Sequence, residues 1–248
     1  MGQKKDIKYV ILIYRERVII ISVYVMSDLH GCYEKYKKML EKIKFNDEDT
    51  LYMLGDVVDR GDSGIKILQD MMKHKNIIPI RGNHDYLAYI MLKAQIGTVS
   101  EYIEDRYAEL FQTWIYDGGQ STFDEFNNLD SGQQRLILSY LNSFLIYDEI
   151  DVNGKTYFLS HTVPEKERFL KFNLLMWQEF IVGEPEYEKI YCLDKIIVTG
   201  HTPTGLIDKD YSGRIYKNNN HIAIDCGAVF DKPLGCIRLD DLEEFYVE

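Results

Sequence analysis

Short apolar runs alternate with amphipathic segments over the first third of the chain. Val18–Met26 and Thr50–Leu54 are apolar and read as buried strands, and a third strand is predicted at Ile77–Ile80. Between them, Glu34–Lys44 and Ser63–His74 carry apolar residues at helical spacing. This alternation predicts an α/β fold whose strands are covered on both faces.

Residues 86–147 depart from that alternation. They predict several helices in succession, interrupted at Gly118 and Gly119, and we interpret them as a helical insertion beside the α/β core. The aromatic residues of this insertion are expected to pack in its core and not to form a binding platform. They are Tyr102, Tyr107, Phe111, Trp114 and Tyr116. Strands are predicted again at Tyr157–Ser160, Lys195–Thr199, His221–Asp225 and Gly235–Leu239.

The organisation predicted for residues 1–248 is one domain, because no repeat or linker divides the sequence. Residues 1–16 are polar and mixed, and they are expected to form either a small extra strand pair or a loosely ordered extension. An acidic stretch near the end reads as solvated surface, and it consists of Asp240, Asp241, Glu243 and Glu244.

Charge and cysteine usage narrow the class of protein. The formal net charge is −11, from 29 basic and 40 acidic residues, so nucleic acids and anionic membranes are not expected partners. The four cysteines form no CxxC pair, and we interpret them as reduced thiols of a cytoplasmic protein. Val18–Met26 is too short to cross a bilayer, which takes roughly 20 apolar residues.

Polar clusters follow five of the predicted strands. Parallel strands deliver such groups to one edge of a sheet, where ligands bind in α/β proteins. Asp28 and His30 alternate by two, so both could project the same way. The five clusters are Ser27–Gly31, Gly55–Gly61, Gly82–Asp85, Ser160–Thr162 and Gly200–Pro203.

These clusters offer carboxylate, amide and imidazole ligands, which suit manganese, iron or zinc. Two such ions about 3.5–4 Å apart can share a carboxylate and a hydroxide, and they neutralise phosphoryl oxygens during in-line displacement. A lone Asp or His at a strand end is more often a turn residue or a helix cap. Five clusters together argue against that interpretation, although His161 and His201 taken singly are weaker signals.

The motifs SDLHG, GDVVDRG and GNHD, followed by FLSHT, VTGHTPT and HIAIDCGAVF, resemble a known family. The sequence is similar to the calcineurin-like metallophosphoesterase superfamily over Val23 to Leu239. Within it, the sequence resembles the phosphoprotein phosphatases of the bacterial and lambda-phage type. The resemblance implies a four-layer α/β/β/α sandwich of two mixed sheets flanked by helices. Both metals would lie at one sheet edge, with residues 86–147 flanking the groove.

The resemblance also implies a role for each matching residue. His84 would protonate the leaving group, Asp59 would orient His84, and Arg60 would bind the phosphoryl oxygens. Two divalent ions are implied as cofactors, manganese first, with iron, zinc or nickel as alternatives. Six residues would bind the metals, with the third of them bridging: Asp28, His30, Asp56, Asn83, His161 and His201.

Four departures from the family pattern bear on the substrate. Ser27 stands where the first motif usually has glycine, and Asp85 stands where the third usually has glutamate. His161 is followed by Thr-Val-Pro instead of a small residue and glycine. Related bacterial enzymes often carry a second phosphate-binding arginine after a tryptophan, but none follows Trp177 here, and Arg168 is the nearest candidate.

The expected activity is hydrolysis of phosphate monoesters by a metal-bridging hydroxide. Phosphoserine and phosphothreonine on proteins are the leading substrates. One alternative is a small phosphorylated molecule such as a symmetrical dinucleoside tetraphosphate. Another is a scaffold that keeps the fold without turnover, but the complete set of candidate ligands argues against it.

Overall fold

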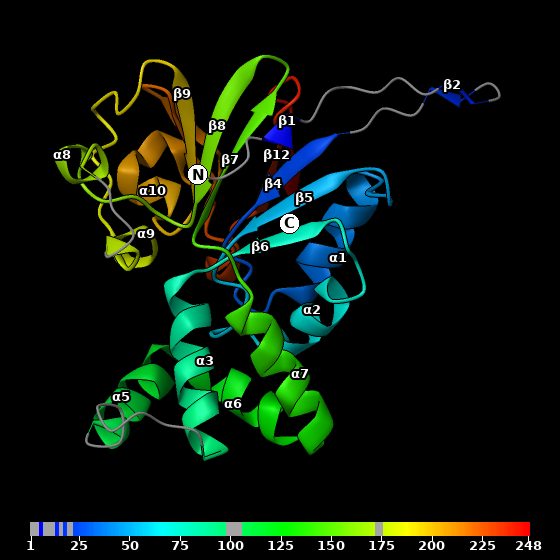
Figure 1. The fold of residues 1–248 in the computed structure, drawn as a ribbon, viewed down its shortest axis with the longest axis vertical. Helices are drawn as coiled ribbons and strands as arrows, with labels where there is room; N and C mark the ends of the chain where they lie inside the picture. The colour runs from blue at the N-terminus through cyan, green and yellow to red at the C-terminus, as the bar shows by residue number, and fades with distance from the viewer. Residues whose placement is uncertain (1–4, 7–12, 15–16, 19–21, 98–105, 172–175) are drawn as a thin grey trace.

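Two β-sheets lie face to face with helices on both outer sides (Figure 1). The structure is a computed structural model, and it describes residues 5–6, 13–14, 17–18, 22–97, 106–171 and 176–248. This is the four-layer α/β/β/α sandwich expected from the family resemblance.

The first sheet has five strands in the order β13-β12-β4-β5-β6. Its three consecutive members β4, β5 and β6 run parallel, while β12 is antiparallel to β4. The parallel order brings the carboxyl ends of β4, β5 and β6 to one edge. The strands span Glu244–Val247 (β13), Leu234–Arg238 (β12), Val23–Met26 (β4), Thr50–Leu54 (β5) and Ile77–Ile80 (β6).

The second sheet has six strands in the order β1-β7-β8-β9-β11-β10. Strands β8 and β9 are parallel, and their carboxyl ends reach the same edge of the sandwich as β4 and β5 (Figure 1). The strands span Lys5–Asp6 (β1), Tyr147–Val152 (β7), Lys155–Ser160 (β8), Lys195–Thr199 (β9), His221–Ala223 (β11) and Tyr216–Asn218 (β10).

Strand β4 shows how the layers form, because alternate side chains of a strand point to opposite faces. Val23 and Val25 belong to the apolar core between the two sheets. Tyr24 and Met26 point the other way and pack in a second core with helices α1 (Tyr33–Lys42) and α2 (Gly64–Met71). The outer face of the second sheet is covered by α8 (Lys166–Phe169), α9 (Glu179–Val182) and α10 (Thr204–Ile207) (Figure 1).

The predicted helical insertion is present below the edge of the sandwich where the strands end (Figure 1). Its first helix begins earlier than expected, at the Gly82–Asp85 motif itself. The glycine pair lies at the end of a π-helical turn, η1, in which Gly118 is non-helical. The elements are α3 (Asn83–Gln95), α5 (Tyr107–Trp114), η1 (Ile115–Gly119), α6 (Gln120–Asn127) and α7 (Ser131–Asn142).

The expectation for the insertion's aromatic residues was only partly right. Trp114 is buried, and Tyr107 and Phe111 pack against the same core. Tyr116 was wrongly placed in the core: it lies on the π-helical turn η1, and it is 95% exposed. Tyr102 lies outside the described residues.

Short strands lie at both ends of the chain, and a small strand pair was one of the two expectations for residues 1–16. Within the first eighteen residues, β1 pairs with β7, and β2 (Ile13–Tyr14) pairs with β3 (Arg17–Val18). Glu244, expected as plain surface, begins the edge strand β13. None of the described helices is long and apolar enough to cross a bilayer.

Candidate active site

Residues from five strand ends converge at one edge of the sandwich. Asp28 and His30 follow β4, Asp56 follows β5, and the other candidate ligands follow β6, β8 and β9. Two groups of three side chains bring their potential ligand atoms together, and within each group these atoms lie within 4.8 Å of one another. The groups, which share Asp56, are His30, Asp56 and His84, and Asp56, His161 and His201.

The backbone at these positions is unusual. Asp28, His30, Asp56 and His201 all have positive φ angles, between 41° and 68°. Residues other than glycine rarely adopt this left-handed region, and such strain is typical of functional sites. Gly82 explains one close approach, because a Cβ there would lie 2.0 Å from Asp56 Oδ1. The strand-end loops therefore hold the carboxylates in positions that ordinary turns would not give.

Hydrogen bonds orient the His30 ring toward Asp56. His30 Nδ1 lies 3.0 Å from the Val58 carbonyl oxygen, to which it donates, so Nε2 carries the lone pair. Nε2 lies 3.6 Å from Asp56 Oδ2. Burial lowers the pKa of His30 to about 3, so the ring is neutral, as a metal ligand must be.

His161 occupies the equivalent position in the second group. Its Nδ1 lies 2.6 Å from the Leu54 carbonyl oxygen, and its Nε2 is 3.4 Å from Asp56 Oδ2. The same Nε2 is 3.0 Å from Asn83 Oδ1 and 3.1 Å from His201 Nδ1. Four potential ligand atoms thus face one small volume. Their oxygen and nitrogen chemistry fits a divalent transition metal.

The electrostatics of the buried carboxylates also fit bound cations. Burial alone would lower the pKa of His161, but Asp56 and Asp28 outweigh it and raise that pKa to about 10. Burial raises the pKa of Asp28 to about 7. In the absence of metal, protons therefore supply positive charge that a divalent ion would supply when bound.

Asp28 is placed differently from the other candidate ligands. In the described residues, neither group of converging ligand atoms includes it. Its Oδ2 accepts hydrogen bonds from the hydroxyl of Ser27 and from the backbone N–H of His201, the latter at 3.0 Å. Ser27, the departure from the family's glycine, is thus a direct partner of a candidate ligand.

The carboxylate of Asp59 is fully buried, and it accepts hydrogen bonds from three side chains. His84 Nδ1 lies 2.9 Å from Asp59 Oδ2, and Trp114 Nε1 donates to the same oxygen at 2.8 Å. The Thr122 hydroxyl donates to Oδ1 at 2.7 Å. Burial alone would lower the pKa of His84, but Asp56 and Asp59 raise it above its ordinary value. The ring is therefore suited to hold a proton near neutral pH.

Arg60 lies across both His30 and His84. Its Nη1 is 2.8 Å from His30 Nε2, and its Nη2 is 2.9 Å from His84 Nε2. Asp117, on η1, lies 3.5 Å from Arg60 Nη2 and 3.5 Å from His84 Nε2, with its side chain 53% exposed. The carboxylate of Asp117 thus contacts the groups that a phosphoryl oxygen would be expected to contact.

Sequence reasoning missed Trp114, Asp117 and Thr122 as members of this site. Gly118 and Gly119 were a usable signal, because a glycine pair after a buried tryptophan suggests a close backbone approach. The Gly118 carbonyl accepts the backbone N–H of Arg60 at 2.8 Å, which ties the insertion to the second motif.

Asp85, which is shorter than the glutamate usual in the family, accepts hydrogen bonds from backbone N–H groups of two motifs. It lies in the first turn of α3 and accepts backbone N–H groups from Asp56 and Val57 of the second motif, at 2.8 and 2.9 Å. It also accepts from the N-cap residue Gly82 at 3.0 Å. The third motif therefore fixes the loop that carries Asp56.

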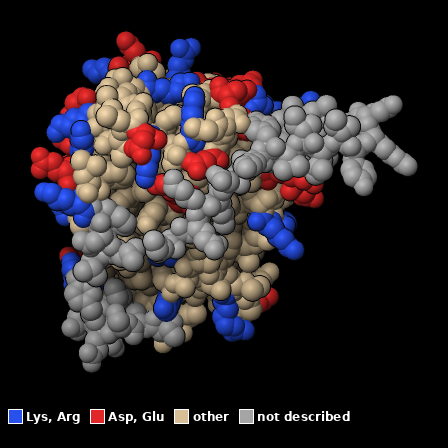
Figure 2. Space-filling model, turned by 45° about the horizontal axis from the view of Figure 1, so that its top comes forward, with Lys and Arg blue, Asp and Glu red and all other residues tan. Residues whose placement is uncertain are grey.

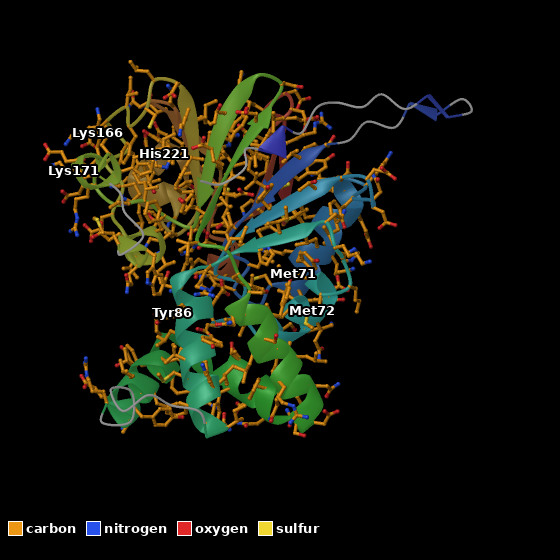
Figure 3. All side chains as sticks on the ribbon, in the orientation of Figure 1. Met71, Met72, Tyr86, Lys166, Lys171 and His221 are labelled. Atoms are coloured by element: carbon orange, nitrogen blue, oxygen red, sulfur yellow. The ribbon has the colours of Figure 1, made fainter. Side chains whose placement is uncertain are left out.

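The missing second arginine is not replaced by Arg168 in this structure. Arg168 pairs with Glu179 on the outer layer, and its side chain is 59% exposed. Trp177 packs edge-to-face on Tyr86, with ring centroids 5.0 Å apart. Figure 3 shows Tyr86 near the end of α3 closest to the sheets. This aromatic contact joins the insertion to the segment before α9.

A carboxylate between two sets of histidine nitrogens, with a guanidinium beside them, is an arrangement typical of binuclear metal hydrolases. A sequence model of the calcineurin-like phosphoesterase family matches residues 21–228. The chain therefore belongs to the calcineurin-like phosphoesterases, as the motifs predicted.

Three similar proteins illustrate the relationship. A symmetrical bis(5'-nucleosyl)-tetraphosphatase from Wigglesworthia glossinidia brevipalpis is 37% identical over 92 residues, which cover 36% of this chain and 33% of the relative. A solved structure provisionally described as a diadenosine tetraphosphatase is 15% identical, covers 91% of this chain and 92% of its own, and has a TM-score of 0.62. A serine/threonine phosphatase from Saccharomyces cerevisiae is 13% identical, with a TM-score of 0.54 over 88% of this chain and 72% of its own.

The comparisons correct the expected substrate. The chain matches only about a third of the length of its curated relatives, and these carry the name of dinucleoside tetraphosphatases. The prediction of a phosphoserine or phosphothreonine protein phosphatase was therefore wrong. It rested on motifs that position metals and phosphate, and such motifs carry no information about the group attached to the phosphate. At 13–15% identity the solved structures show the shared fold alone.

Proposed function

We propose that this chain hydrolyses symmetrical dinucleoside tetraphosphates to two nucleoside diphosphates, using two divalent metal ions, manganese first. The observation that carries the proposal is the buried Asp56 carboxylate shared by two groups of histidine nitrogens, with Arg60 beside them. The names of the curated relatives support the choice of substrate.

The proposed metal-binding roles follow the family resemblance, and the geometry supports them for the ligands other than Asp28. The first ion would be held by Asp28, His30 and Asp56, and the second by Asp56 together with Asn83, His161 and His201. When bound, the ions would supply an activated water near neutral pH and neutralise charge on the phosphoryl oxygens. The carbonyls of Val58 and Leu54 accept hydrogen bonds from Nδ1 of His30 and His161, which leaves Nε2 of each ring facing Asp56.

Three further residues act on the substrate or on each other. Arg60 binds oxygens of the reacting phosphate with its planar pair of N–H donors. His84 donates a proton to the phosphate oxygen that leaves with the nucleoside diphosphate. Asp59 is a positioning residue, because it holds His84 Nδ1–H and so directs Nε2 toward the reacting group.

The remaining properties are consistent with a small anionic substrate. Figure 2 shows acidic and basic side chains intermixed on the described part of one face, which suits a molecule that attracts its substrate locally. None of the four cysteines is paired, which supports the expected cytoplasmic location. We also infer that residues 1–248 act as one catalytic domain.

The test is hydrolysis of diadenosine tetraphosphate with manganese, followed by chromatographic identification of the products. We expect ADP alone. Release of AMP with ATP, or cleavage of a phosphoserine peptide but not of the dinucleotide, would overturn the proposal. No turnover of either compound with manganese, iron, zinc or nickel would favour the scaffold.

A variant pair separates catalysis from folding. His84→Asn is expected to lower kcat by about 10²–10⁴, the usual contribution of a positioned acid. His74→Asn is the matched control, because His74 packs against Phe45 away from the site. Equal kcat values for the two variants would end the proposed role of His84.

A further inference from the structure

Phe230 is a large apolar side chain exposed beside the phosphate-contact residue Arg60. Its ring centroid lies 5.6 Å from Arg60 Cζ, so one part of the ring faces the guanidinium. Phe230 nevertheless remains 55% exposed. More than half of the Phe230 surface is therefore open to contact with a ligand. The Arg60 guanidinium contacts this ring and also lies next to the candidate metal ligand His30. Arg60 therefore links Phe230 to the site.

The turn that carries Phe230 is held firmly. It is the 3₁₀ turn η4 (Ala228–Phe230) between β11 and β12. The N–H of Gly227 donates to Asp225 Oδ1 at 2.8 Å, and the N–H of Phe230 donates to the Gly227 carbonyl at 2.8 Å. Lys35 Nζ donates to the Ala228 carbonyl at 3.1 Å from α1. The backbone that carries the ring is thus fixed before any ligand binds, which lowers the entropy cost of using the ring.

We propose that Phe230 is a stacking platform for the nucleobase of a nucleotide whose phosphates bind at Arg60. The inference deepens the proposed function and rests on it for the choice of a nucleotide ligand. Every base has a π-face, and aromatic side chains bind bases by stacking on it. Arg60 then contacts the phosphates with its N–H edge while Phe230 contacts the base.

A platform of this kind defines which substrates are accepted. Stacking does not read the hydrogen-bonding edge of a base, so adenine and guanine nucleotides should bind alike. Uracil has a smaller ring system, and its nucleotide should bind less tightly. The subsite would therefore select nucleotides over bare phosphates while tolerating different purines.

The experiment measures binding and not turnover. ADP and inorganic pyrophosphate are titrated calorimetrically, with manganese present, into wild type, Phe230→Leu and Phe230→Trp. Wild type should bind ADP about 5- to 150-fold more tightly than pyrophosphate, the range expected for one stacked base. Phe230→Leu should lose that preference and keep the pyrophosphate affinity within about twofold. Phe230→Trp, which keeps an aromatic ring, should keep the preference for ADP over pyrophosphate.

Tyr116→Leu is the matched control, since Tyr116 is an exposed aromatic side chain on η1, the turn whose Gly118 carbonyl accepts the backbone N–H of Arg60. It should leave the preference for ADP intact. Equal ADP and pyrophosphate affinities in wild type, an unchanged preference in Phe230→Leu, or an equal loss in Tyr116→Leu would each overturn the assignment.

The two proposals can fail separately. If wild type cleaves the dinucleotide but Phe230→Leu binds ADP normally, the platform falls and the proposed activity stands. If the dinucleotide is not cleaved but ADP binding depends on Phe230, the activity falls and a nucleotide subsite remains.

Discussion

The three side chains that donate to the Asp59 carboxylate come from the helical region that begins at the third motif. His84 lies on α3, Trp114 on α5 and Thr122 on α6. The Thr122 hydroxyl also accepts the backbone N–H of Asp59 at 2.9 Å. A single hydroxyl thus fixes both the backbone and the side chain of the residue that positions His84.

Replacing that hydroxyl should therefore affect both stability and rate. Thr122→Val keeps the shape but removes the donor to a buried carboxylate, so the free energy of unfolding should fall by about 1–3 kcal/mol. We expect kcat to fall about tenfold, equivalent to about 1.4 kcal/mol in the barrier. Denaturant unfolding and steady-state kinetics measure the two effects. Thr122→Ser, which keeps the hydroxyl, should behave like wild type, and a Ser variant as slow as the Val variant would contradict this account.

Asp117 should oppose phosphate binding, because its carboxylate lies 3.5 Å from both Arg60 and His84. Asp117→Asn removes that charge and should tighten competitive inhibition by inorganic phosphate. Half-exposed ion pairs contribute modestly, so about a two- to fivefold lower inhibition constant is expected. Asp124→Asn makes the same charge change on the exposed side of α6 and should have no effect. Weaker inhibition in Asp117→Asn would show that the carboxylate assists binding.

At the scale of elements, the π-helical turn η1 joins the insertion to the second motif. Gly118 has φ = 103°, and a Cβ at this position would lie 2.7 Å from Arg60 Cγ. Both the backbone conformation and the close approach require glycine. Single-turn π-helical irregularities are frequently found at functional sites, and this one adjoins the candidate site.

Gly118→Ala is predicted to displace Arg60 as well as strain the turn. The left-handed backbone should cost about 1–3 kcal/mol in stability, and the KM should rise because the guanidinium moves. Gly97→Ala isolates the first effect, since Gly97 has φ = 93° but no atom within 4 Å of a new Cβ. The Tm of thermal unfolding should be lowered in both variants, and KM should rise only in Gly118→Ala. A normal KM in Gly118→Ala would contradict the proposed link to Arg60.

The elements that the sequence predicted best are those with a strong local pattern. Thr50–Leu54, Ile77–Ile80 and Lys195–Thr199 are apolar runs that end at polar motifs, and each is a strand with those bounds. Strand β7 was not predicted, because acidic residues interrupt its apolar pattern, and its pairing with β8 is what stabilises it.

The site could be predicted only as far as its residues follow strands. His30, Asp56 and His161 lie next to apolar runs, which made their convergence a topological expectation. The burial of Trp114 was also predictable, but the contact of its indole N–H with Asp59 was not. Helical spacing indicates which face of a helix is buried and leaves open where the polar tip of an aromatic residue points.

At the scale of the whole molecule, metal binding and stability should be linked through protons. Asp28 ionises near its ordinary value when unfolded and at about 7 when folded without metal, so the folded state binds more protons in that interval. The pKa of His161 is raised to about 10, so this residue extends the same trend upward from pH 6.5. Below pH 6.5 the neutral His30 and His201, whose pKa values are lowered to about 3 and about 4, oppose this trend, so metal-free protein should lose stability chiefly as the pH rises above 6.5.

Metal ions replace these protons, so their stabilising effect should grow with pH. We expect the difference in Tm between manganese-loaded and chelator-treated protein to be larger at pH 8 than at pH 5. Differential scanning calorimetry at several pH values measures it. Asp28→Asn should flatten the part of the trend between about pH 4 and 7. A difference in Tm that shrinks with rising pH would contradict the assignment of these residues to metal binding.

The three-donor support of Asp59 limits how this protein can be rebuilt. A chimera that receives the helical region of a distant relative would keep all six candidate metal ligands only if residue 83 survives the splice. Even then, the transplanted region would need an indole and a hydroxyl placed like those of Trp114 and Thr122, so that both donate to Asp59 together with the imidazole. A graft lacking them should load metal normally and still be a slow enzyme, so the helical region and the sandwich have to be exchanged, or evolve, together.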